Sequence, residues 1–367
     1  MAALALAAQA FTVHRNFGGD WTALFVTSAD RELPIGLEAH RFHETMGYDG
    51  QFYRVLAHDP LLRRVDPIFF DAPALRWRRI LTPALAYLVA LGRPSWIDPA
   101  YVAVTLGFLA LGVFWSARFC RGAGLPAWWG AGFVLLPASI ISLERMTVDL
   151  GLLALAAGFA YLARGPRGPA LWAVMALAPL ARETGAVLPL ACAAEALARR
   201  DWRDLGKAVA AGLPGLAWYG WVHTHVGSDP VRFVDQWPLQ ALLVRTFDWS
   251  AVPLEASRQA VAGGLDQLAL LGVWAALALS AAAVWTERGV IRWAVGLFCV
   301  FPVLLSYPGV WAEAYAFARI LSPLALWLAL MGFERRRYVG LLPLALMAPR
   351  ILAQLAPHLL GDGKGWN

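Results

Sequence analysis

Asp49 is the residue in this sequence best placed to act as a general base. It lies in a polar stretch, residues 47–53, and its near neighbours there are Tyr48, Gly50, Gln51 and Tyr53. A general base needs a carboxylate presented from a mobile point, with donors nearby that set its pKa. The structural alternative is a helix N-cap, because Asp is favoured at that position. A cap does not require these flanking residues, so the stretch favours a catalytic or substrate-binding role.

Further polar residues around Asp49 are predicted to contact a substrate. They are Tyr48, Gln51, Tyr53 and Asp59. Asp59 precedes Pro60, so it either ends a helix that begins near Asp49 or supplies a second acid. Asp20 is likewise a second acid or a turn residue, whereas Asp71 is predicted to be a turn residue.

Arginines at predicted outer helix ends form a second group: Arg76, Arg78, Arg79, Arg145, Arg182 and Arg319. Positive charge in membrane proteins gathers on the cytoplasmic side, so arginines on the other side need a partner. A guanidinium binds phosphate through two parallel hydrogen bonds, which makes a lipid phosphate a natural partner. Snorkelling to headgroups, or pairing with Glu144, Glu183 or Glu313, is the alternative. The residues of this group expected to contact substrate are Arg76, Arg79, Arg182, Glu183 and Arg319.

Arg79 and Arg319 begin the same short pattern. Residues 79–83 and 319–323 both read Arg-Ile-Leu, then Thr or Ser, then Pro, and each is predicted to open an apolar helix from the outer side. The pattern is either ordinary helix-start chemistry repeated by chance in a leucine-rich chain, or a pair of arginines that face one phosphate.

The elements that must position these residues are predicted to be membrane-spanning helices. Hydrophobic residues make up 59% of the 367 residues, charged residues make up 15%, and the mean hydropathy is +0.55. An ordinary soluble domain is about half apolar and a quarter charged. Backbone groups in lipid must be satisfied within the chain, which favours helices. The predicted fold class is all-α, a polytopic transmembrane helix bundle with an outer-face loop that carries juxtamembrane helices.

Basic clusters divide the predicted spans between two sides of the membrane. The apolar runs are 100–117, 125–142, 150–162, 169–181, 185–198, 208–222, 261–285, 290–306, 316–333 and 339–355. Lys and Arg clusters follow every second run, which assigns those loops to the cytoplasm. The Asp49 segment and the loop over 223–258 then lie together outside. The count is about 10 or 11 spans, including the first helix.

This scheme gives one integral membrane domain over residues 1–367. Its parts are a short first helix or signal-like segment (1–13), an outer loop with juxtamembrane helices (14–98), the transmembrane bundle (99–356) and a tail (357–367). Within the outer loop, Phe52, Val55 and Leu56 share one face of the predicted helix over 49–58. That helix is expected to lie on the membrane surface.

Several other classes of function are disfavoured by the residue patterns. The basic residues form short clusters and no single stripe, so nucleic acid is not an expected partner. Cys120, Cys192 and Cys299 are far apart and indicate no disulfide framework. His223 and His225 give only a weak metal signal, and interfacial histidines are the default interpretation. No nucleotide-binding glycine pattern stands at a credible place, which disfavours a nucleotide-driven pump.

The layout resembles that of the GT-C superfamily of integral membrane glycosyltransferases. It has a short first helix, an outer loop with an early acid, and arginines leading into a proline-containing apolar helix. More closely, residues 48–53, 59–60, 76–83 and 182–185 are similar to bacterial YDGQFY-type membrane proteins linked to cell-surface glycopolymer formation. The specific motifs lie mainly between Asn16 and Gly185, although the layout extends over most of the chain.

The resemblance implies a hexosyltransferase of the bacterial inner membrane with its active site on the periplasmic or outer side. The donor would be a polyprenyl-phosphate-linked sugar, and the acceptor a cell-surface glycan, lipid or protein. Asp49 would take the proton of the acceptor hydroxyl and give inversion, while arginines hold the departing phosphate. No cofactor is assigned by the resemblance, which leaves a divalent cation open. Membrane lipids are the remaining expected partners.

Two other classes of function stay open at this point. A transporter or flippase for a lipid-linked glycan predicts ionisable residues near the middle of spans, whereas the charges here gather at helix ends. A non-catalytic subunit of a glycan-assembly complex predicts that Asp49→Asn leaves glycan assembly intact.

Overall fold

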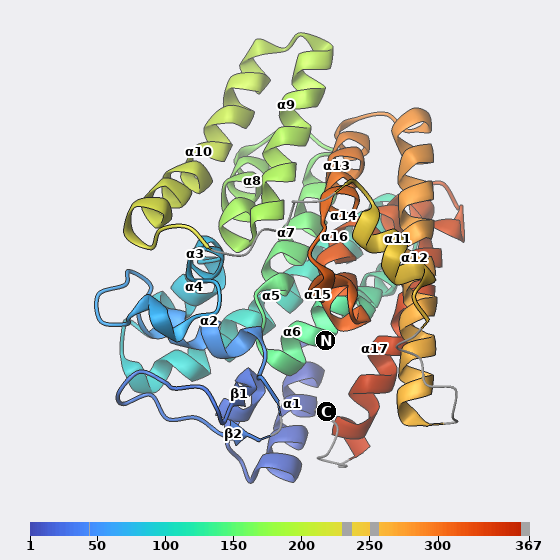
Figure 1. Ribbon diagram of the computed structural model, residues 1–367. Helices are drawn as coiled ribbons and strands as arrows, with labels where there is room; N and C mark the ends of the chain where they lie inside the picture. The colour runs from blue at the N-terminus through green and yellow to red at the C-terminus, as the bar shows by residue number, and fades with distance from the viewer. Residues whose placement is uncertain (44, 230–236, 250–256, 361–367) are drawn as a thin grey trace.

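The computed structural model describes residues 1–43, 45–229, 237–249 and 257–360 of the chain. Short elements make up the N-terminal part, the lower left of Figure 1. They are α1 (Ala2–Phe17), η1 (Trp21–Phe25), β1 (Thr27–Ser28), β2 (Arg41–Phe42), α2 (Asp49–His58), η2 (Pro67–Phe69), α3 (Pro73–Arg78) and α4 (Leu81–Val89). The two strands are parallel, with Thr27 opposite Arg41 and Ser28 opposite Phe42.

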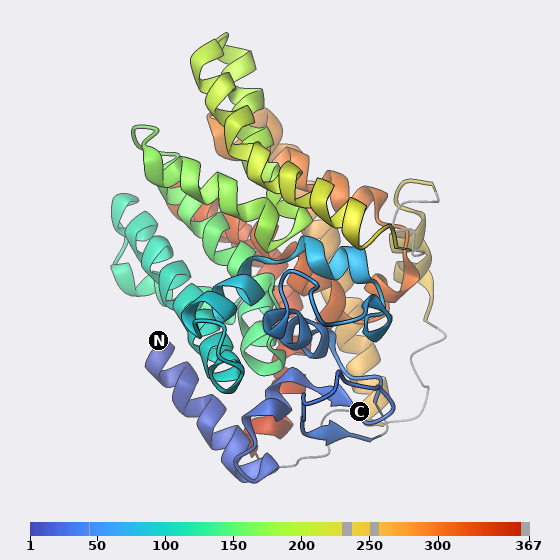
Figure 2. The same cartoon turned by 90° about the vertical axis from the view of Figure 1, so that its left-hand side faces the viewer.

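The rest of the described chain is a helical bundle. It comprises α5 (Pro94–Gly122), η3 (Ala127–Leu135), α6 (Pro137–Arg145), α7 (Asp149–Leu162), α8 (Pro169–Ala181), η4 (Glu183–Ala186), α9 (Val187–Arg199), α10 (Trp202–His225), α11 (Gln240–Phe247), α12 (Arg258–Thr286), α13 (Val290–Phe298), α14 (Val300–Leu304), α15 (Pro308–Trp311), α16 (Ala314–Glu334), η5 (Tyr338–Leu341) and α17 (Leu342–Leu360). The turn between α9 and α10 projects from one end, away from β1 and β2 (Figures 1 and 2). The all-α class is confirmed at this level.

Fewer helices than the sequence predicts are long enough to cross a bilayer alone. Within the described ranges four helices meet the length and composition of a span, over residues 94–122, 258–286, 314–334 and 338–356. Ala127–Leu135 and Pro137–Arg145 make a fifth if the 58° bend between them lies within one span. Several other expected spans are shorter, and 14 residues such as Asp149–Leu162 reach only about 21 Å of a ~30 Å hydrocarbon core. Several long apolar helices indicate a multi-pass membrane protein.

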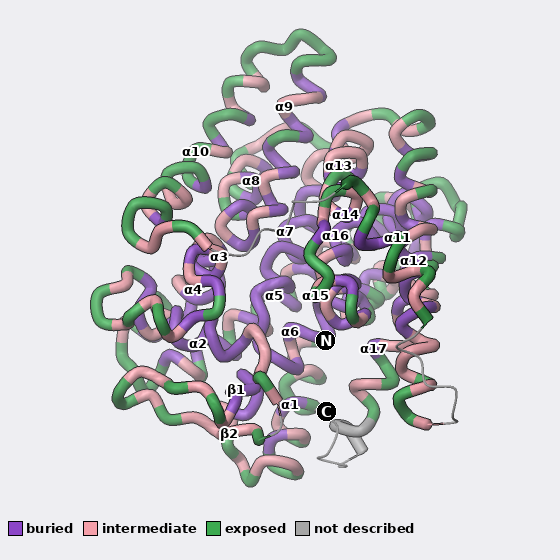
Figure 3. The backbone as a smooth tube through the Cα atoms, in the orientation of Figure 1, coloured by how far each residue is buried: buried purple, intermediate pink, exposed green. Residues whose placement is uncertain are grey.

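Helices α7 and α16 form the centre of the bundle. The side chains from Asp149 to Ala160 are all buried, and 89% of the apolar window of α16 is buried as well. Trp327 of α16 donates from Nε1 to the carbonyl oxygen of Ala156 at 3.1 Å. Figure 3 shows this continuous buried centre in purple. Asp149 of α7 and Arg319 of α16 are therefore held away from solvent, with side chains 4% and 10% exposed.

Helix α2 has the predicted bounds, but it is not a surface helix. Residues 50–57 are all buried, on the polar as well as the apolar face of the helix. It packs on α4 and α5 as well as against η1. The apolar face of Phe52, Val55 and Leu56 is real, but neighbouring elements also cover the opposite face, which overturns the expected position on a membrane surface.

The segment after α10 reaches the N-terminal part of the chain. Asp229 accepts hydrogen bonds from the backbone N–H groups of Ala74 and Leu75, at 2.9 and 2.7 Å. The two segments that the sequence assigns to one side of the membrane therefore meet. Residues 230–236 and 250–256 of the second predicted loop, and 361–367 of the predicted tail, lie outside the described residues.

Candidate functional site

Asp49 lies between two arginines that come from distant parts of the chain. Its Oδ1 is 3.0 Å from Nη2 of Arg76, and its Oδ2 is 2.6 Å from Nη2 of Arg319. Asp49 is the first residue of α2 rather than its N-cap, which is Tyr48, and no side chain caps the helix. The capping alternative is therefore wrong, because both carboxylate oxygens are bound to guanidinium groups.

Arg76 and Arg79 enter the site together from α3 and its C-cap. Arg76 makes a fork with Asp71 at 3.0 and 2.7 Å, and Arg79 makes one with Glu183 at 2.8 and 2.6 Å. Both also donate to the hydroxyl of Tyr53, at 3.4 and 3.1 Å. Residues three apart on a helical turn share a face, which brings these two guanidiniums side by side. Asp71, expected to be a turn residue, is an arginine partner.

Asp149 joins two further arginines at the base of the site. It is the first residue of α7, where the helix dipole favours a negative charge. Its Oδ1 contacts Nη1 of Arg182, and its Oδ2 is 3.4 Å from Nη1 of Arg319. Arg319 therefore binds one carboxylate with each of its two terminal nitrogens.

We name these ion pairs together the arginine–carboxylate cluster. Its members are Arg76, Arg79, Arg182, Arg319, Asp49, Asp71, Asp149 and Glu183. Four cations and four anions make it neutral as a whole. The four arginines are buried or nearly so, and they come from segments spread over most of the chain. A neutral cluster lowers the cost of burying charge, since each ion keeps an opposite partner.

A stack of cations and rings links the start of α2 to the bundle. The Arg145 guanidinium lies 4.4 Å from the ring centre of Tyr48 and 4.7 Å from that of Tyr315. Arg319 lies on Tyr48 too, at 4.9 Å. Tyr315 donates its hydroxyl to Glu144 at 2.7 Å. The residue before Asp49 is thus held by arginines of two other helices.

The turn between α6 and α7 explains how the charged residues of the segment 144–149 become buried. Met146 ends α6 in the left-handed region with φ of 47°, and the chain turns at once into α7. The Ser142 hydroxyl accepts from the Leu150 N–H at 3.1 Å and bonds Thr147 at 2.9 Å. These bonds satisfy the turn internally, so the corner can be covered by other helices.

Gly50 allows α2 to approach this corner closely. A Cβ at this position would overlap the carbonyl oxygen of Arg145 and would lie 3.0 Å from that of Phe25. Gly50 is helical and buried, so Asp49 is not presented from a mobile point. It serves close packing, which fixes Asp49 in place.

The arginines control the protonation of the acids. Burial raises the pKa of Asp49, but the charges of Arg319 and Arg76 outweigh it and hold the pKa well below its usual range. Burial is likewise outweighed at Glu183, where Arg79 lowers the pKa to about 2. For Arg76 and Arg79 the facing acids overcome burial and raise the pKa. Asp49, Glu183, Arg76 and Arg79 are therefore ionised at neutral pH.

Exposure increases from the base of the cluster to its mouth. The Asp149 side chain is 4% exposed, that of Asp49 is 17% exposed, and that of Glu183 is 30% exposed. An apolar groove of about 270 Å³ begins beside η4, between α8, α9 and α10. Its walls include Pro179, Ala186 and Tyr219. The 3-10 helix η4 therefore begins with a member of the cluster, Glu183, and ends with a residue that lines the groove, Ala186.

Two of the residues predicted to contact substrate lie outside the cluster. Gln51 accepts from the Ser28 N–H at 3.2 Å and donates to the Met46 carbonyl at 3.2 Å. Asp59 is the C-cap of α2, and its oxygens accept from three consecutive backbone N–H groups, residues 63–65. Both hold loops together in this structure. The other predicted site residues lie in or against the cluster: Tyr48, Asp49, Tyr53, Arg76, Arg79, Arg182, Glu183 and Arg319.

The repeated pattern at residues 79–83 and 319–323 has two different settings. Arg79 does precede the apolar helix α4, whereas Arg319 lies inside α16, five residues after its start. Both arginines nevertheless belong to the same cluster. The expectation that each opens a helix is wrong for Arg319.

Asp149 is the main site residue that the sequence does not single out. It looks like an ordinary helix-end acid in the polar knot 144–149, and only the folded chain brings it to Arg182 and Arg319. A signal was present, since Glu144, Arg145 and Asp149 interrupt a long apolar region. Buried ionisable residues in such regions are commonly functional.

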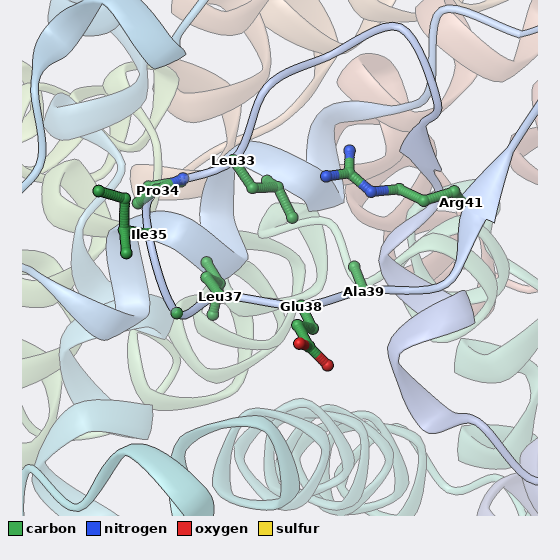
Figure 4. Close-up of a pocket in the computed structure, with 8 residues that line it drawn as sticks. Leu33, Pro34, Ile35, Leu37, Glu38, Ala39 and Arg41 are labelled. Atoms are coloured by element: carbon green, nitrogen blue, oxygen red, sulfur yellow. The ribbon is translucent and has the colours of Figure 1, made fainter.

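Two other features lie apart from the cluster. A hollow of about 440 Å³ is bordered by residues 33–41, where the Glu38 carboxylate points away from Arg41 (Figure 4). Arg41 itself donates to the carbonyls of Ser28 and Arg31. As for metals, no group of three or more His, Cys, Asp or Glu side chains in the described part of the chain could hold an ion.

Comparison with protein-family models, with curated proteins and with solved structures found no match to this chain.

Proposed function

We propose that this protein is a membrane glycosyltransferase that moves a sugar from a polyprenyl-phosphate donor to a glycan, lipid or protein acceptor. Asp49 is the base, and the arginines of the cluster hold the phosphate. One observation carries the proposal: the partly exposed carboxylate of Asp49 is bound from two sides by the largely buried arginines Arg76 and Arg319. A base beside cations that can stabilise a leaving phosphate is what such a transfer requires.

The guanidinium forks support a phosphate ligand. Arg76 and Arg79 each bind a carboxylate through two nitrogens, and the same geometry suits two oxygens of a phosphate. The carboxylates of the cluster thus occupy positions that phosphate oxygens can take. Four arginines gathered in a chain with only 15% charged residues are costly without such a role.

The apolar groove supports a lipid-linked donor. A polyprenyl chain needs a continuous apolar surface next to the site of its phosphate. The groove between α8, α9 and α10 starts at Ala186, three residues beyond Glu183. A phosphate at the mouth of the cluster would place the attached chain at the head of this groove.

The reaction follows from these roles. The acceptor hydroxyl oxygen attacks the anomeric carbon, the bond from that carbon to the phosphate oxygen breaks, and its electron pair stays on the phosphate. The hydroxyl proton passes to Asp49. Attack opposite the leaving phosphate inverts the configuration of the sugar. We place the site on the outer side of a bacterial inner membrane, because the basic loops assign the opposite ends of the helices to the cytoplasm.

The test is Asp49→Asn in the parent bacterium, read as surface glycan composition and as the amount of polyprenyl-phosphate sugar. Transfer should fall by about a hundredfold or more, since the base is lost. The donor should accumulate. Asp66→Asn is the matched control, because the side chain of that acid accepts from the nearby Ile68 N–H and lies outside the cluster.

The alternatives give different results in the same experiment. A non-catalytic subunit predicts unchanged glycan with the variant stably inserted. A transporter predicts donor accumulation on one side of the membrane only, with transfer restored when the donor is supplied on the outer side. The buried pair Asp266–Arg350, at 3.1 Å between two candidate spans, is the feature that a transporter would use. Asp266 also accepts from the Ala314 N–H at 2.9 Å, which fits a structural role at the start of α16.

A further inference from the structure

We propose that Asp49 and the donor phosphate use Arg319 in turn, and that Asp149 is the positioning residue that makes this exchange possible. The inference rests on the proposed function, and it assigns to Asp149 a role that the transfer reaction alone does not require.

Arg319 has two carboxylate partners, so it can release one and keep the other. One terminal nitrogen is 2.6 Å from Asp49 and the other is 3.4 Å from Asp149. Its guanidinium also lies on the ring of Tyr48. If the contact with Asp49 breaks, Arg319 keeps a buried anion and an aromatic surface. It can therefore move toward a phosphate without becoming an unpaired buried charge, which would be costly.

Arg76 is the more constrained of the two arginines on Asp49. It holds Asp71 with two nitrogens, and its guanidinium lies 4.7 Å from the ring centre of Phe52 and 5.5 Å from that of Tyr53. The contact with Asp49 shares a nitrogen already used by Asp71. Arg76 thus stays in place while Arg319 moves.

The charges of the reaction match this exchange. Before transfer, Asp49 and the donor phosphodiester each carry one negative charge. Afterwards Asp49 is protonated and neutral, while the released phosphomonoester carries two. The total is unchanged, because Asp49 loses one negative charge while the phosphate gains one. The arginine that Asp49 no longer needs as a partner can therefore pair with the new negative charge of the phosphate. One arginine moving between them keeps a positive charge beside whichever group is the more negative, and the net charge of the site does not change during transfer.

The exchange also prepares the base. A carboxylate held by two guanidiniums binds a proton weakly, whereas a good general base has a pKa nearer the working pH. Release of Arg319 strengthens Asp49 as a base only after the phosphate has bound. The charged and titratable groups that act most strongly on Asp49 among the described residues include Tyr48 from its own segment, Arg76 from α3, Arg79 from the C-cap of α3, and Arg319 from α16.

The experiment measures protonation of Asp49 directly. Carbodiimides label carboxyl groups in their protonated form, and mass spectrometry locates the label. Purified protein in detergent is labelled at about pH 5 with and without a polyprenyl monophosphate, and thermal stability reports whether the lipid binds. Inorganic phosphate at the same concentration serves as the probe for an anion without a lipid chain.

Asp49 of the wild type should remain unlabelled without the lipid and become labelled when polyprenyl monophosphate is bound. The extent of labelling should increase by about tenfold for each unit by which the pKa of Asp49 rises. Arg319→Gln should be labelled in both conditions. In Asp149→Asn the lipid should bind, yet labelling should stay low because Arg319 has no second anion to hold it. Asp149→Glu should restore the increase.

Three results would overturn the proposal. Lipid that stabilises the wild type without changing its labelling removes the exchange but keeps the phosphate site. An increase in Asp149→Asn equal to that of the wild type removes the role of Asp149, since the phosphate charge alone then explains it. Lipid that neither stabilises the wild type nor changes its labelling removes the phosphate site itself, and the proposed function falls with it. The wild-type arms decide the first and third results even if Asp149→Asn does not fold.

Discussion

The two ends of α2 carry buried ion pairs of different kinds. At its C-terminal half, Arg54 makes a fork with Asp98 of α5 at 2.9 and 2.8 Å, and His58 lies 3.3 Å from the same carboxylate. At its N-terminus, Asp49 is shared by two arginines, each of which has another acid of its own. Arg54 has one carboxylate partner and holds it with two nitrogens, whereas the arginines on Asp49 have a choice of partners.

This difference in the number of partners suggests different roles for the two sets of ion pairs. An arginine fork on one carboxylate, with His58 beside it, fixes the position of α2 on α5 and gains nothing from an added anion. A network in which Asp49, Arg76 and Arg319 each bind two partners can lose one contact and stay paired. The feature that distinguishes the cluster from the Arg54–Asp98 pair is therefore the sharing of partners, since both contain buried charge.

The largest expected effect follows from removing the shared arginine. Arg319→Gln should lower sugar transfer by about a hundredfold or more, because it takes away a charge that stabilises the leaving phosphate. Arg54→Gln should retain transfer for every molecule that folds. Radiolabelled donor consumption by isolated membranes, normalised to inserted protein, measures both. Equal losses in the two variants would show that the ends of α2 do not differ.

Gly50→Ala tests how closely α2 must approach the α6–α7 corner. The added methyl would overlap a backbone carbonyl, so the helix and Asp49 must shift, at a cost of about 1–3 kcal/mol in the free energy of unfolding. Gly107→Ala in α5 is the matched control, because nothing lies within 4 Å of its Cβ position. Thermal unfolding in detergent compares them. A control as damaged as Gly50→Ala would point to a general intolerance of the fold.

The two ends of α2 should differ in what a substitution affects. At the C-terminal half a substitution should lower stability more than sugar transfer, and at the N-terminus it should lower transfer more than stability. Asp98→Asn leaves Arg54 without the one carboxylate that it contacts among the described residues and should cost about 1–3 kcal/mol, whereas transfer persists. Asp49→Asn should cost less, since Arg76 and Arg319 keep Asp71 and Asp149. Melting temperatures of the two variants, measured side by side, check this order, and the reverse order would contradict the distinction.

The smallest expected effect is a pH dependence of stability that comes from the acids of the arginine–carboxylate cluster. The folded pKa values of Asp49 and Glu183 are lowered, the latter to about 2, below unfolded values of about 3.9 and 4.3. The unfolded chain then binds more protons as pH falls. Stability from these acids is complete above about pH 5 and decreases toward the folded pKa values. Melting temperature in that range should decrease less in Glu183→Gln than in the wild type, and identical slopes would count against the assignment.

Local features of the chain could be predicted well. The helix over 49–58 has the predicted bounds, since Tyr48 precedes it and Asp59 and Pro60 end it. The arginines at 76, 79, 182 and 319 were expected to matter, because positive charge at an outer helix end needs a partner.

Features that depend on tertiary contacts could not be predicted. The charged residues near Asp149 mark it only as part of a polar interruption, because its two arginine partners lie 33 and 170 residues away. The burial of both faces of α2 depends on α4, α5 and η1 closing over it. Breaks at proline and at 3-10 turns split several apolar runs into short helices, which hydropathy over 20 residues does not resolve.

The most direct test of the central claim is whether the cluster binds a lipid phosphate. Thermal unfolding of purified protein with increasing polyprenyl monophosphate should show stabilisation of about 2.7 kcal/mol at a hundredfold excess over Kd for the wild type. The lipid should stabilise Arg54→Gln by the same amount, measured relative to that variant without lipid. It should stabilise Arg182→Gln much less. Equal stabilisation of all three proteins, or none in the wild type, would contradict a phosphate site at the arginine–carboxylate cluster.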